Sequence, residues 1–456
     1  MFHWGCTNPI GYDTMGNKHC ISATIMLPSE QEAYDICNAA PKPSAEGLLA
    51  SEPVLQAPAG DSMGVAFAVN GLSVGFAEVS KSPGMEGATR FISDGFPRAA
   101  PDDRILRVRM DGLQPGTRYW YRVGAARLAH PIGYWSKLGD IDWGAVHSFM
   151  TPGPGAPSCF AVFGDTHADF PSMARVTAKY RELGLPLVVW NGDVLPSKID
   201  DRESLVRHFI DIPENAGYAA DTSILFNCGN HDYRGDLAGK LGDAMMPRPQ
   251  REVAGRDPLL DRNFALRMGD IALIGLDTGE DKPDDHIANA GMTAFSRHRQ
   301  LQAAWLEDAL SSKEIAEAPF AVAIVHIPLF DPDPDANPGT VLINYAQWQK
   351  ECADLWVPTL ERHGVGLVVA GHTHRYRFDP PDPGRPWAQL VCGGAGAGTF
   401  QTLAVVEVED GELVVRVHDT DSGNIVAVHR FPRRATWKPI TRDNLRAILH
   451  EPKDTK

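Results

Sequence analysis

The chain has 456 residues, more than one hydrophobic core usually supports, so we expect two domains. Its 43 Lys and Arg against 58 Asp and Glu give a net charge of −15, and no basic run or stripe occurs, which argues against nucleic acid as the main partner. No apolar stretch approaches the roughly 20 residues of a membrane-spanning helix, so we expect no membrane span.

The first 51 residues predict no recognisable fold, apart from a helix-like stretch around Glu30–Cys37. The amino terminus lacks the basic and apolar segments of a signal peptide. An exported protein without its signal peptide would begin in the same way, so the compartment stays open. The seven cysteines form no Cys-x-x-Cys pair, and neither a thiolate zinc site nor a redox motif is expected. In an oxidising compartment two of Cys6, Cys20 and Cys37 could form a disulfide.

Residues 52–152 predict a small all-β sandwich. Short apolar runs separated by Gly and Pro turns are typical of its strands, which we expect at 54–56, 64–69, 73–79, 105–110 and 119–123. The segment Leu113–Tyr119 resembles the turn and tyrosine corner of fibronectin type III domains, which implies a fibronectin type III-like domain. Residues 151–157, rich in Pro and Gly, are then predicted to be a linker.

From Ser158 the pattern changes to apolar runs that alternate with helical segments, which indicates an α/β domain over 158–432. Helical patterns occur at 171–183, 202–212, 300–311 and 344–363. Two alternating runs around Asp410-Gly411 then predict a β-hairpin over 403–418. Residues 433–456 are polar and are predicted to be a C-terminal tail.

Five polar clusters follow apolar runs in this second domain. They are Gly164-Asp165-Thr166-His167, Gly192-Asp193, Gly229-Asn230-His231-Asp232, His326 and Gly371-His372-Thr373-His374. One Gly-Asp after a strand is usually only a turn. However, ligand sites form at the carboxyl ends of strands in open α/β sheets, so the five clusters are expected to converge. Their imidazole, carboxylate and amide groups favour Zn, Mn or Fe(II) over Ca or Mg, and the set predicts a dinuclear metal site.

Taken in order, these clusters resemble the motifs of calcineurin-like metallophosphoesterases, and the preceding sandwich resembles the purple acid phosphatase branch. The resemblance covers about residues 52–430. It implies an α/β fold in which a metallophosphoesterase-type β-sandwich is flanked by helices in α-β-β-α layers, and it implies two divalent metal ions. By motif position Asp193 would bridge the two metals. The other ligands would be Asp165, His167 and His374 for the first metal and Asn230, His326 and His372 for the second.

The resemblance also implies catalytic roles. A hydroxide shared by the two metals would be the nucleophile of an in-line attack. His231 has no metal in the family pattern, so we predict that it hydrogen-bonds to the phosphate and protonates the leaving oxygen as the general acid. Asp232 would orient the His231 ring. Asn230, His231, Tyr233 and Arg234 are the predicted substrate-binding residues.

Two positions depart from the purple acid phosphatase pattern. His167 stands where that branch has Gly, and Pro196 stands where it has a tyrosine ligand. Without a tyrosinate there is no charge-transfer chromophore. We therefore expect a colourless enzyme, and visible absorption by the purified protein would contradict this expectation.

The predicted function is that of a metal-dependent phosphatase acting on small phosphate monoesters. A phosphodiesterase on the same metal core is an alternative. Outside the enzymes, the alternative is a non-catalytic binding or adhesion protein that uses the sandwich. Against this last reading, none of the seven ligands is missing, and neither is His231. The acidic stretches 280–285 and 331–335 follow strand ends, and if they face the site they would discourage strongly anionic substrates.

Overall fold

The structure is a computed structural model that describes residues 11–12, 18–19, 29–93, 97–248, 260–332, 345–396 and 398–434. Cys6, Cys20 and nearly all of the predicted tail lie outside these ranges, while Cys37 is a free thiol. At the start of the chain two short strands pair, β1 (Gly11–Tyr12) and β2 (Lys18–His19). None of the described helices is long and apolar enough to cross a membrane.

Helix α1 (Glu30–Ala39) confirms the helix expected near the start. The Ser29 hydroxyl accepts a hydrogen bond from the Glu32 N–H, and the Glu32 carboxylate accepts one from the Ser29 N–H, which closes a capping box. At the other end, the Lys137 ammonium donates to three backbone carbonyls of the last turn and cap. Because Lys137 lies on strand β9 (Trp135–Trp143), these bonds fix α1 to the sandwich that follows.

Two antiparallel sheets build this sandwich. One contains β3 (Val54–Ala59), β4 (Ser62–Ala68) and β7 (Ile105–Asp111). The other contains β6 (Thr89–Ile92), β5 (Ser73–Ser80), β8 (Arg118–Ile132) and β10 (His147–Met150), with β9 beside β8. Phe67, Tyr121 and Phe149 are among the buried side chains of its core. The Tyr119 hydroxyl accepts a hydrogen bond from the Gln114 N–H at 2.9 Å, the contact that a tyrosine corner makes.

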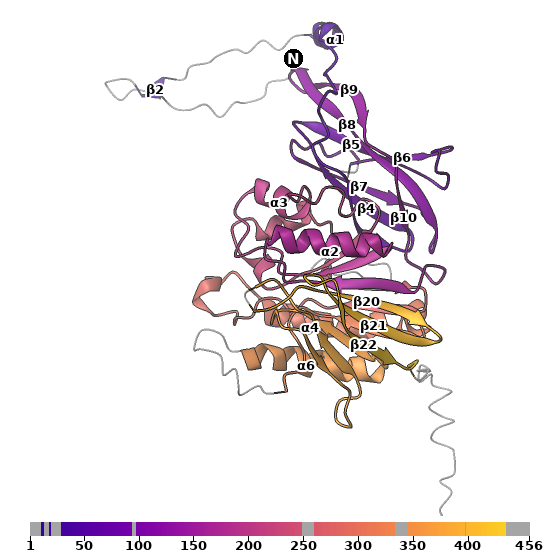
Figure 1. The fold of residues 1–456 in the computed structure, drawn as a ribbon. Coiled ribbons are helices and arrows are strands. Elements are labelled where there is room, and N and C mark those ends of the chain that lie inside the picture. Colours follow the sequence, from indigo (N-terminus) through magenta and orange to yellow (C-terminus); the bar gives the residue numbers. More distant parts are fainter. Residues whose placement is uncertain are drawn as a thin grey trace, which may run out of the picture.

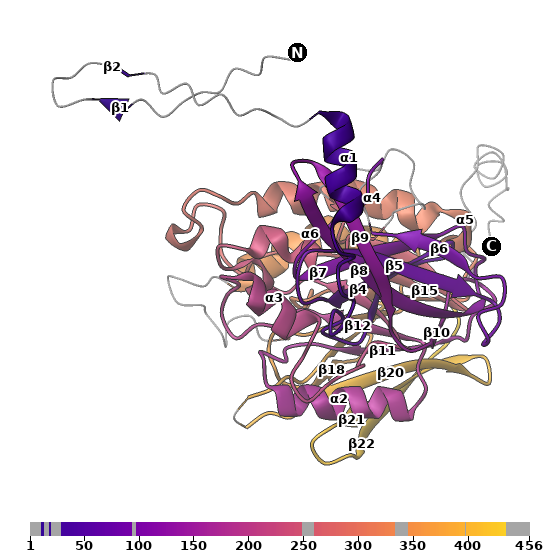
Figure 2. The same cartoon turned by 90° about the horizontal axis from the view of Figure 1, so that it is seen from above.

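The second domain has four layers (Figures 1 and 2). Its first sheet runs in the order β22 (Ile425–Phe431), β21 (Glu412–Asp419), β20 (Thr402–Glu409), β11 (Cys159–Phe163), β12 (Leu187–Asn191) and β13 (Ser223–Asn227). The second runs in the order β14 (Phe264–Met268), β15 (Ile271–Gly275), β16 (Phe320–Ile324), β17 (Leu367–Ala370), β19 (Ala388–Val391) and β18 (Arg377–Asp379). Helices α2 (Phe170–Glu182) and α3 (Arg202–Phe209) cover the first sheet, while α4 (Phe295–Ser311), α5 (Lys313–Ala316) and α6 (Tyr345–Arg362) cover the second. The α-β-β-α prediction is confirmed.

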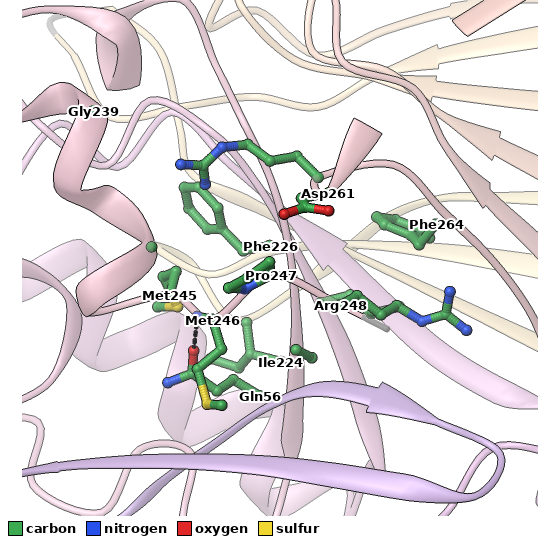
Figure 3. Close-up of a pocket in the computed structure, with 14 residues that line it drawn as sticks. Gln56, Ile224, Phe226, Gly239, Met245, Met246, Pro247, Arg248, Asp261 and Phe264 are labelled. Carbon is green, nitrogen blue, oxygen red and sulfur yellow. Dashed lines mark hydrogen bonds between the residues drawn. The ribbon is translucent and has the colours of Figure 1, made fainter. Parts of the chain in front are cut away.

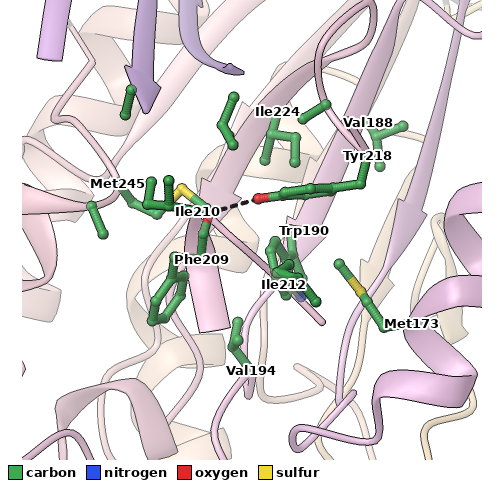
Figure 4. Close-up of a cluster of buried hydrophobic side chains, with 14 of the residues drawn as sticks. Met173, Val188, Trp190, Val194, Phe209, Ile210, Ile212, Tyr218, Ile224 and Met245 are labelled. Carbon is green, nitrogen blue, oxygen red and sulfur yellow. Dashed lines mark hydrogen bonds between the residues drawn. The ribbon is translucent and has the colours of Figure 1, made fainter. Parts of the chain in front are cut away.

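Apolar cores hold these layers together. Between the helices α2 and α3 and the first sheet, the Trp190 ring stacks on Phe163 with a centroid distance of 5.5 Å. The Trp190 ring also meets Tyr218 edge-on (Figure 4). The Tyr218 hydroxyl donates to the Phe209 carbonyl at 2.7 Å, so its buried polar group is satisfied. A second core fills the space between the two sheets. The central strands are thus buried on both faces, which explains their continuous apolar sequences.

Backbone pairing also joins the two domains. Strand β3 lies parallel to β13, with Gln56 opposite Ile224, so the first sheet continues into the sandwich and has nine strands. Figure 3 shows the cavity of about 150 Å³ beside this pairing. There the Gln56 side chain accepts from the Met246 N–H and donates to the Ala244 carbonyl. One sheet therefore contains strands from both sides of the predicted linker at residues 151–157.

His147 on β10 adds a charged contact between the domains. Its Nδ1 lies 3.2 Å from Asp221, which precedes β13, and its Nε2 lies 3.3 Å from Glu52. The hydrogen bond to Asp221, together with the two negative charges, raises the pKa of His147 despite its partial burial. A raised pKa means that the contact stabilises the fold fully below the ordinary pKa of about 6.5, and that this stabilisation is lost as the pH rises through the folded-state pKa.

We therefore expect His147→Gln to destabilise the protein only at low pH. Because both partner carboxylates are about half exposed, the loss should stay within about 1 kcal/mol at about pH 5.5 and vanish near about pH 9. Denaturant unfolding at both pH values measures this loss, with His130→Gln, at an exposed position of strand β8, as the control. An equal loss at the two pH values would contradict the linkage.

Candidate metal centre

Five loops converge at the carboxyl ends of β11, β12, β13, β16 and β17. Within the described ranges, two groups of side chains have possible ligand atoms that all lie within 4.8 Å of one another. The first group is Asp165, His167, Asp193 and His374, and the second is Asp193, His326 and His372. The structure thus brings together all the acidic and imidazole ligands that the sequence predicted.

Asn230, the seventh predicted ligand, lies in the second group. Its Oδ1 is 2.9 Å from His372 Nδ1 and 3.2 Å from His326 Nε2. Asp193 is common to both groups, because its Oδ2 lies 3.5 Å from His167 Nε2 and 3.4 Å from His326 Nε2. The arrangement suits a carboxylate shared by two cations.

Sharp turns of the backbone place these ligands. Asp165, His167, Asp193, His372 and His374 all have a positive φ, between 43° and 70°. Residues other than Gly rarely adopt this left-handed conformation, and each instance costs roughly 1–3 kcal/mol. Five strained residues at one site indicate that the surrounding contacts hold the loops in a conformation required by the site rather than by the fold.

A glycine-rich loop that the sequence motifs did not include supplies some of these contacts. In Gly393-Gly394-Ala395-Gly396, the Ala395 N–H donates to the Asp165 carbonyl at 3.0 Å, and the Ala395 carbonyl lies 3.0 Å from His374 Nδ1. A Cβ at Gly394 would lie only 2.4 Å from the Asp165 Cβ, so this approach requires glycine. Three glycines in four residues after an apolar run were the signal for this loop.

Backbone carbonyls also orient the imidazoles of the first group. His167 Nδ1 lies 2.9 Å from the Leu195 carbonyl, and His374 Nδ1 lies 3.0 Å from the Ala395 carbonyl. A proton donated from Nδ1 leaves the Nε2 lone pair facing the centre. The two Nε2 atoms are then 2.9 Å apart with no proton between them. Two nitrogen lone pairs at this distance repel each other, and the repulsion is relieved when both nitrogens coordinate a cation. The geometry therefore fits a metal.

The charges of the centre fit divalent cations as well. Asp165 and Asp193 are buried, and neither forms an ion pair with Lys or Arg in the part of the chain that the structure describes. Burial, partly offset by His326, raises the pKa of Asp165 to about 7. Burial acts in the same direction on Asp193, but neighbouring imidazoles hold its pKa below the ordinary value. Buried carboxylates of this kind require paired positive charge.

His231 lies beside the centre but enters neither ligand group. Its Nε2 is 3.9 Å from Asp193 Oδ2, and its ring meets that of His167 at a centroid distance of 4.8 Å. Burial lowers the pKa of His231 to about 4 in the absence of substrate. A phosphate dianion beside the ring would favour its protonated form.

The predicted contact between Asp232 and the His231 ring is not formed. The Asp232 carboxylate instead accepts hydrogen bonds from the backbone N–H groups of Asp193 and Gly229, both at 2.9 Å. Among the described residues, His231 Nδ1 has no hydrogen-bond partner. The two side chains leave the 3-10 helix η1 (His231–Tyr233) in different directions, one buried and one partly exposed. Asp232 therefore holds the loops after β12 and β13 together and does not orient the His231 ring.

Tyr233 and Arg234, which were predicted to bind substrate, have partners within the protein. The Tyr233 hydroxyl donates to the Asp277 carboxylate, and its ring packs edge-on against Phe295 at 5.0 Å. The Arg234 guanidinium donates two hydrogen bonds of 2.8 Å to the Glu280 carboxylate. Both residues line a cavity, but neither is freely available to a phosphate.

The acidic stretch after β15 also differs from the prediction. Glu280 and Asp281 are buried and pair with Arg234 and Lys282, so these acids do not present an exposed barrier to anionic substrates. Part of the other acidic stretch, 333–335, lies outside the described residues.

Two layers of sheet carry, at their strand ends, Asp and His side chains that could hold metal ions, an arrangement typical of metallophosphoesterase-type hydrolases. The model of a family described as calcineurin-like phosphoesterase matches residues 160–376. The chain therefore carries a calcineurin-like phosphoesterase domain, and the protein is a phosphoesterase.

Solved structures share the fold. A purple acid phosphatase isolated from yellow lupin (Lupinus luteus) seeds has a TM-score of 0.57 and 13% identity, over 84% of this chain and 74% of that one. The structure of PhoD has a TM-score of 0.53 and 12% identity, over 87% of this chain and 94% of that one. Among curated proteins no sequence matches. At such identities these likenesses bear on the fold alone.

Divalent metal is expected to stabilise this protein markedly. A cation that binds only the folded state, present at a hundred times its Kd, adds about 2.7 kcal/mol, which for a chain of 456 residues corresponds to a rise in Tm of about 3 °C. Calorimetry of chelator-treated protein before and after addition of Zn²⁺ or Mn²⁺ measures the rise. Mg²⁺ and Ca²⁺ should give a smaller one, and an unchanged Tm with every cation would contradict the metal centre.

Proposed function

We propose that this protein is a metal-dependent phosphatase that hydrolyses small phosphate monoesters. The observation that supports it most is the pair of ligand groups that share Asp193, with His231 beside them. Two divalent cations (Zn, Mn or Fe(II)) bound there would activate water for in-line attack and stabilise the leaving oxygen. The residues that would hold them are Asp165, His167, Asp193, Asn230, His326, His372 and His374.

The protein's own side chains would bind the phosphate and supply a proton. His231 approaches Asp193 from outside both ligand groups, so its ring can donate to a phosphate oxygen and then to the leaving oxygen. Asn230 turns its carbonyl oxygen toward His326 and His372, which leaves its amide N–H groups for the phosphate. Asp232 contributes by fixing the loops that carry Asp193 and Asn230.

The first domain and the charge of the chain complete the proposal. The tyrosine corner at Tyr119 supports a fibronectin type III-like domain. The net charge of −15 supports a small phosphate ester, rather than nucleic acid, as the partner.

One comparison tests the substrate class. Metal-reconstituted protein is assayed with para-nitrophenyl phosphate and with bis(para-nitrophenyl) phosphate, and the proposal expects kcat/KM to be at least about tenfold higher for the monoester. A preference for the diester would show that the protein is a phosphodiesterase and not a phosphate monoesterase. If protein with a full complement of metal hydrolyses neither ester, the remaining reading is a binding protein that uses its sandwich domain.

A further inference from the structure

A cavity of about 1010 Å³ lies beside the turn that follows His231. Tyr233 and Arg234, on its wall, belong to the turn that bears His231. The Arg234 N–H donates a hydrogen bond to the His231 carbonyl at 3.1 Å, which holds this part of the wall beside His231. Ligand pockets of proteins occupy roughly 300–1,000 Å³, so this volume can hold an organic group much larger than phosphate.

Several charged groups on the wall neutralise one another, but Arg262 does not take part. Arg234 and Lys282 both pair with Glu280. Arg262 is half-buried and lines the cavity, yet its guanidinium makes no hydrogen bond or ion pair with any residue that the structure describes. Its charge is balanced only at longer range, by groups that include Asp277. Its N–H donors are therefore left for a ligand.

Two further charged residues of the cavity wall, Arg297 and Asp236, are exposed to solvent. Arg297 is exposed in the first turn of α4 and, among the described residues, has no ion-pair partner. Asp236 is exposed as well, and Asp261 is engaged by other contacts. Arg262 is thus the cation whose position inside the cavity best suits recognition of an anion.

The rest of the wall includes apolar surface. Phe295 packs against Tyr233, Leu301 follows on α4, and Met292 is 82% exposed. An apolar wall with an unpaired guanidinium matches a ligand that has an apolar body and a carboxylate or phosphate group, because the planar guanidinium binds either oxyanion through two parallel hydrogen bonds.

We propose that this cavity receives the leaving group of the substrate and that Arg262 binds an oxyanion on that group. The inference rests on the proposed phosphatase function and adds a substrate class to it. That class is the phosphate monoesters of aromatic or otherwise apolar alcohols that carry a second anionic group. His231 would face the ester oxygen, while Arg262 would hold the far end of the alcohol.

Binding of the alcohol product tests the cavity without any hydrolysis. Isothermal titration of the metal-free protein with para-hydroxybenzoate and with phenol is expected to show at least about tenfold tighter binding of the benzoate. The reason is that the carboxylate forms charge-assisted hydrogen bonds with the Arg262 guanidinium, which phenol does not form. Arg262→Gln should abolish this difference, whereas Arg181→Gln, at an exposed position of α2, should preserve it. A parallel titration with para-hydroxyphenyl phosphate shows which oxyanion is preferred.

Equal binding of the benzoate and phenol by the natural protein, or a difference that survives in Arg262→Gln, would overturn the inference. Should Arg262→Gln not fold, as judged by its Tm, Arg262→Lys serves instead. It keeps the charge but not the forked geometry, so it should lose part of the preference.

Hydrolysis separates this inference from the proposed function. With metals bound, the ratio of KM for phenyl phosphate to KM for para-carboxyphenyl phosphate should fall about tenfold in Arg262→Gln. If the natural protein hydrolyses neither ester but binds para-hydroxybenzoate through Arg262, the phosphatase proposal fails and the anion site stands. If it hydrolyses both with a ratio that Arg262→Gln does not change, the phosphatase stands and the anion site is refuted.

Discussion

Replacing Asp193 by Asn is expected to abolish hydrolysis of para-nitrophenyl phosphate and to empty the metal centre. Asp193 belongs to both ligand groups, so the substitution weakens both cation positions at once. It also removes the negative charge that faces the imidazoles of His167 and His326. We expect kcat/KM to fall by at least about 10³-fold, equivalent to about 4 kcal/mol of transition-state stabilisation.

Metal analysis of the purified proteins completes this test. The natural protein should bind about two metals per chain, and Asp193→Asn fewer than about one. Asp200→Asn is the matched control, because it makes the same chemical change at an exposed residue that follows the same strand and, among the described residues, forms an ion pair with Lys198 alone. Full turnover and full metal content in Asp193→Asn would refute the shared-carboxylate centre.

The second large effect is expected at His231. Because this ring belongs to neither ligand group, His231→Ala should keep its metals yet lower kcat by about 10²–10⁴-fold, the usual contribution of a general acid. The loss should be larger for phenyl phosphate than for para-nitrophenyl phosphate, since nitrophenolate leaves readily without a proton.

A series of substituted phenyl phosphates measures this dependence, with metal content determined in parallel. His130→Ala, on an exposed strand segment of the sandwich, is the control. A large loss that is equal across the series would limit His231 to binding the phosphate. Unchanged turnover with full metal content would remove it from the reaction.

The ligand loops could be predicted because each follows a buried strand. Asp165, Asp193 and Asn230 follow three neighbouring parallel strands, β11, β12 and β13, so they must emerge at one edge of the sheet. His326 and His372 follow β16 and β17, which are parallel neighbours in the second sheet. Apolar runs and strand direction are local or near-local properties, and they determine most of this geometry.

Other features depend on information that a local sequence does not contain. Asp232 and His231 are adjacent in sequence, yet Asp232 is buried while His231 is partly exposed. The hairpin strand β9 was not predicted, because its apolar residues do not alternate regularly with polar ones and its stability comes from pairing with the long strand β8. Likewise, Gln56 meets Ile224 across a pairing that neither segment encodes alone.

The pairing of β3 with β13 makes the sandwich a structural part of the phosphoesterase domain and not an exchangeable module. Cutting the chain at its Pro-rich linker would strip a neighbour from β13, the strand that leads into Asn230 and His231, and would leave an open sheet edge prone to aggregation. The cut would also remove Val54 and Ile105 from the hydrophobic core that contains residues of α2 and α3. Fusing the phosphoesterase domain to another protein would therefore require replacing the contacts that β3 makes with β13. The solubility of truncated versions should be measured before their activity is interpreted.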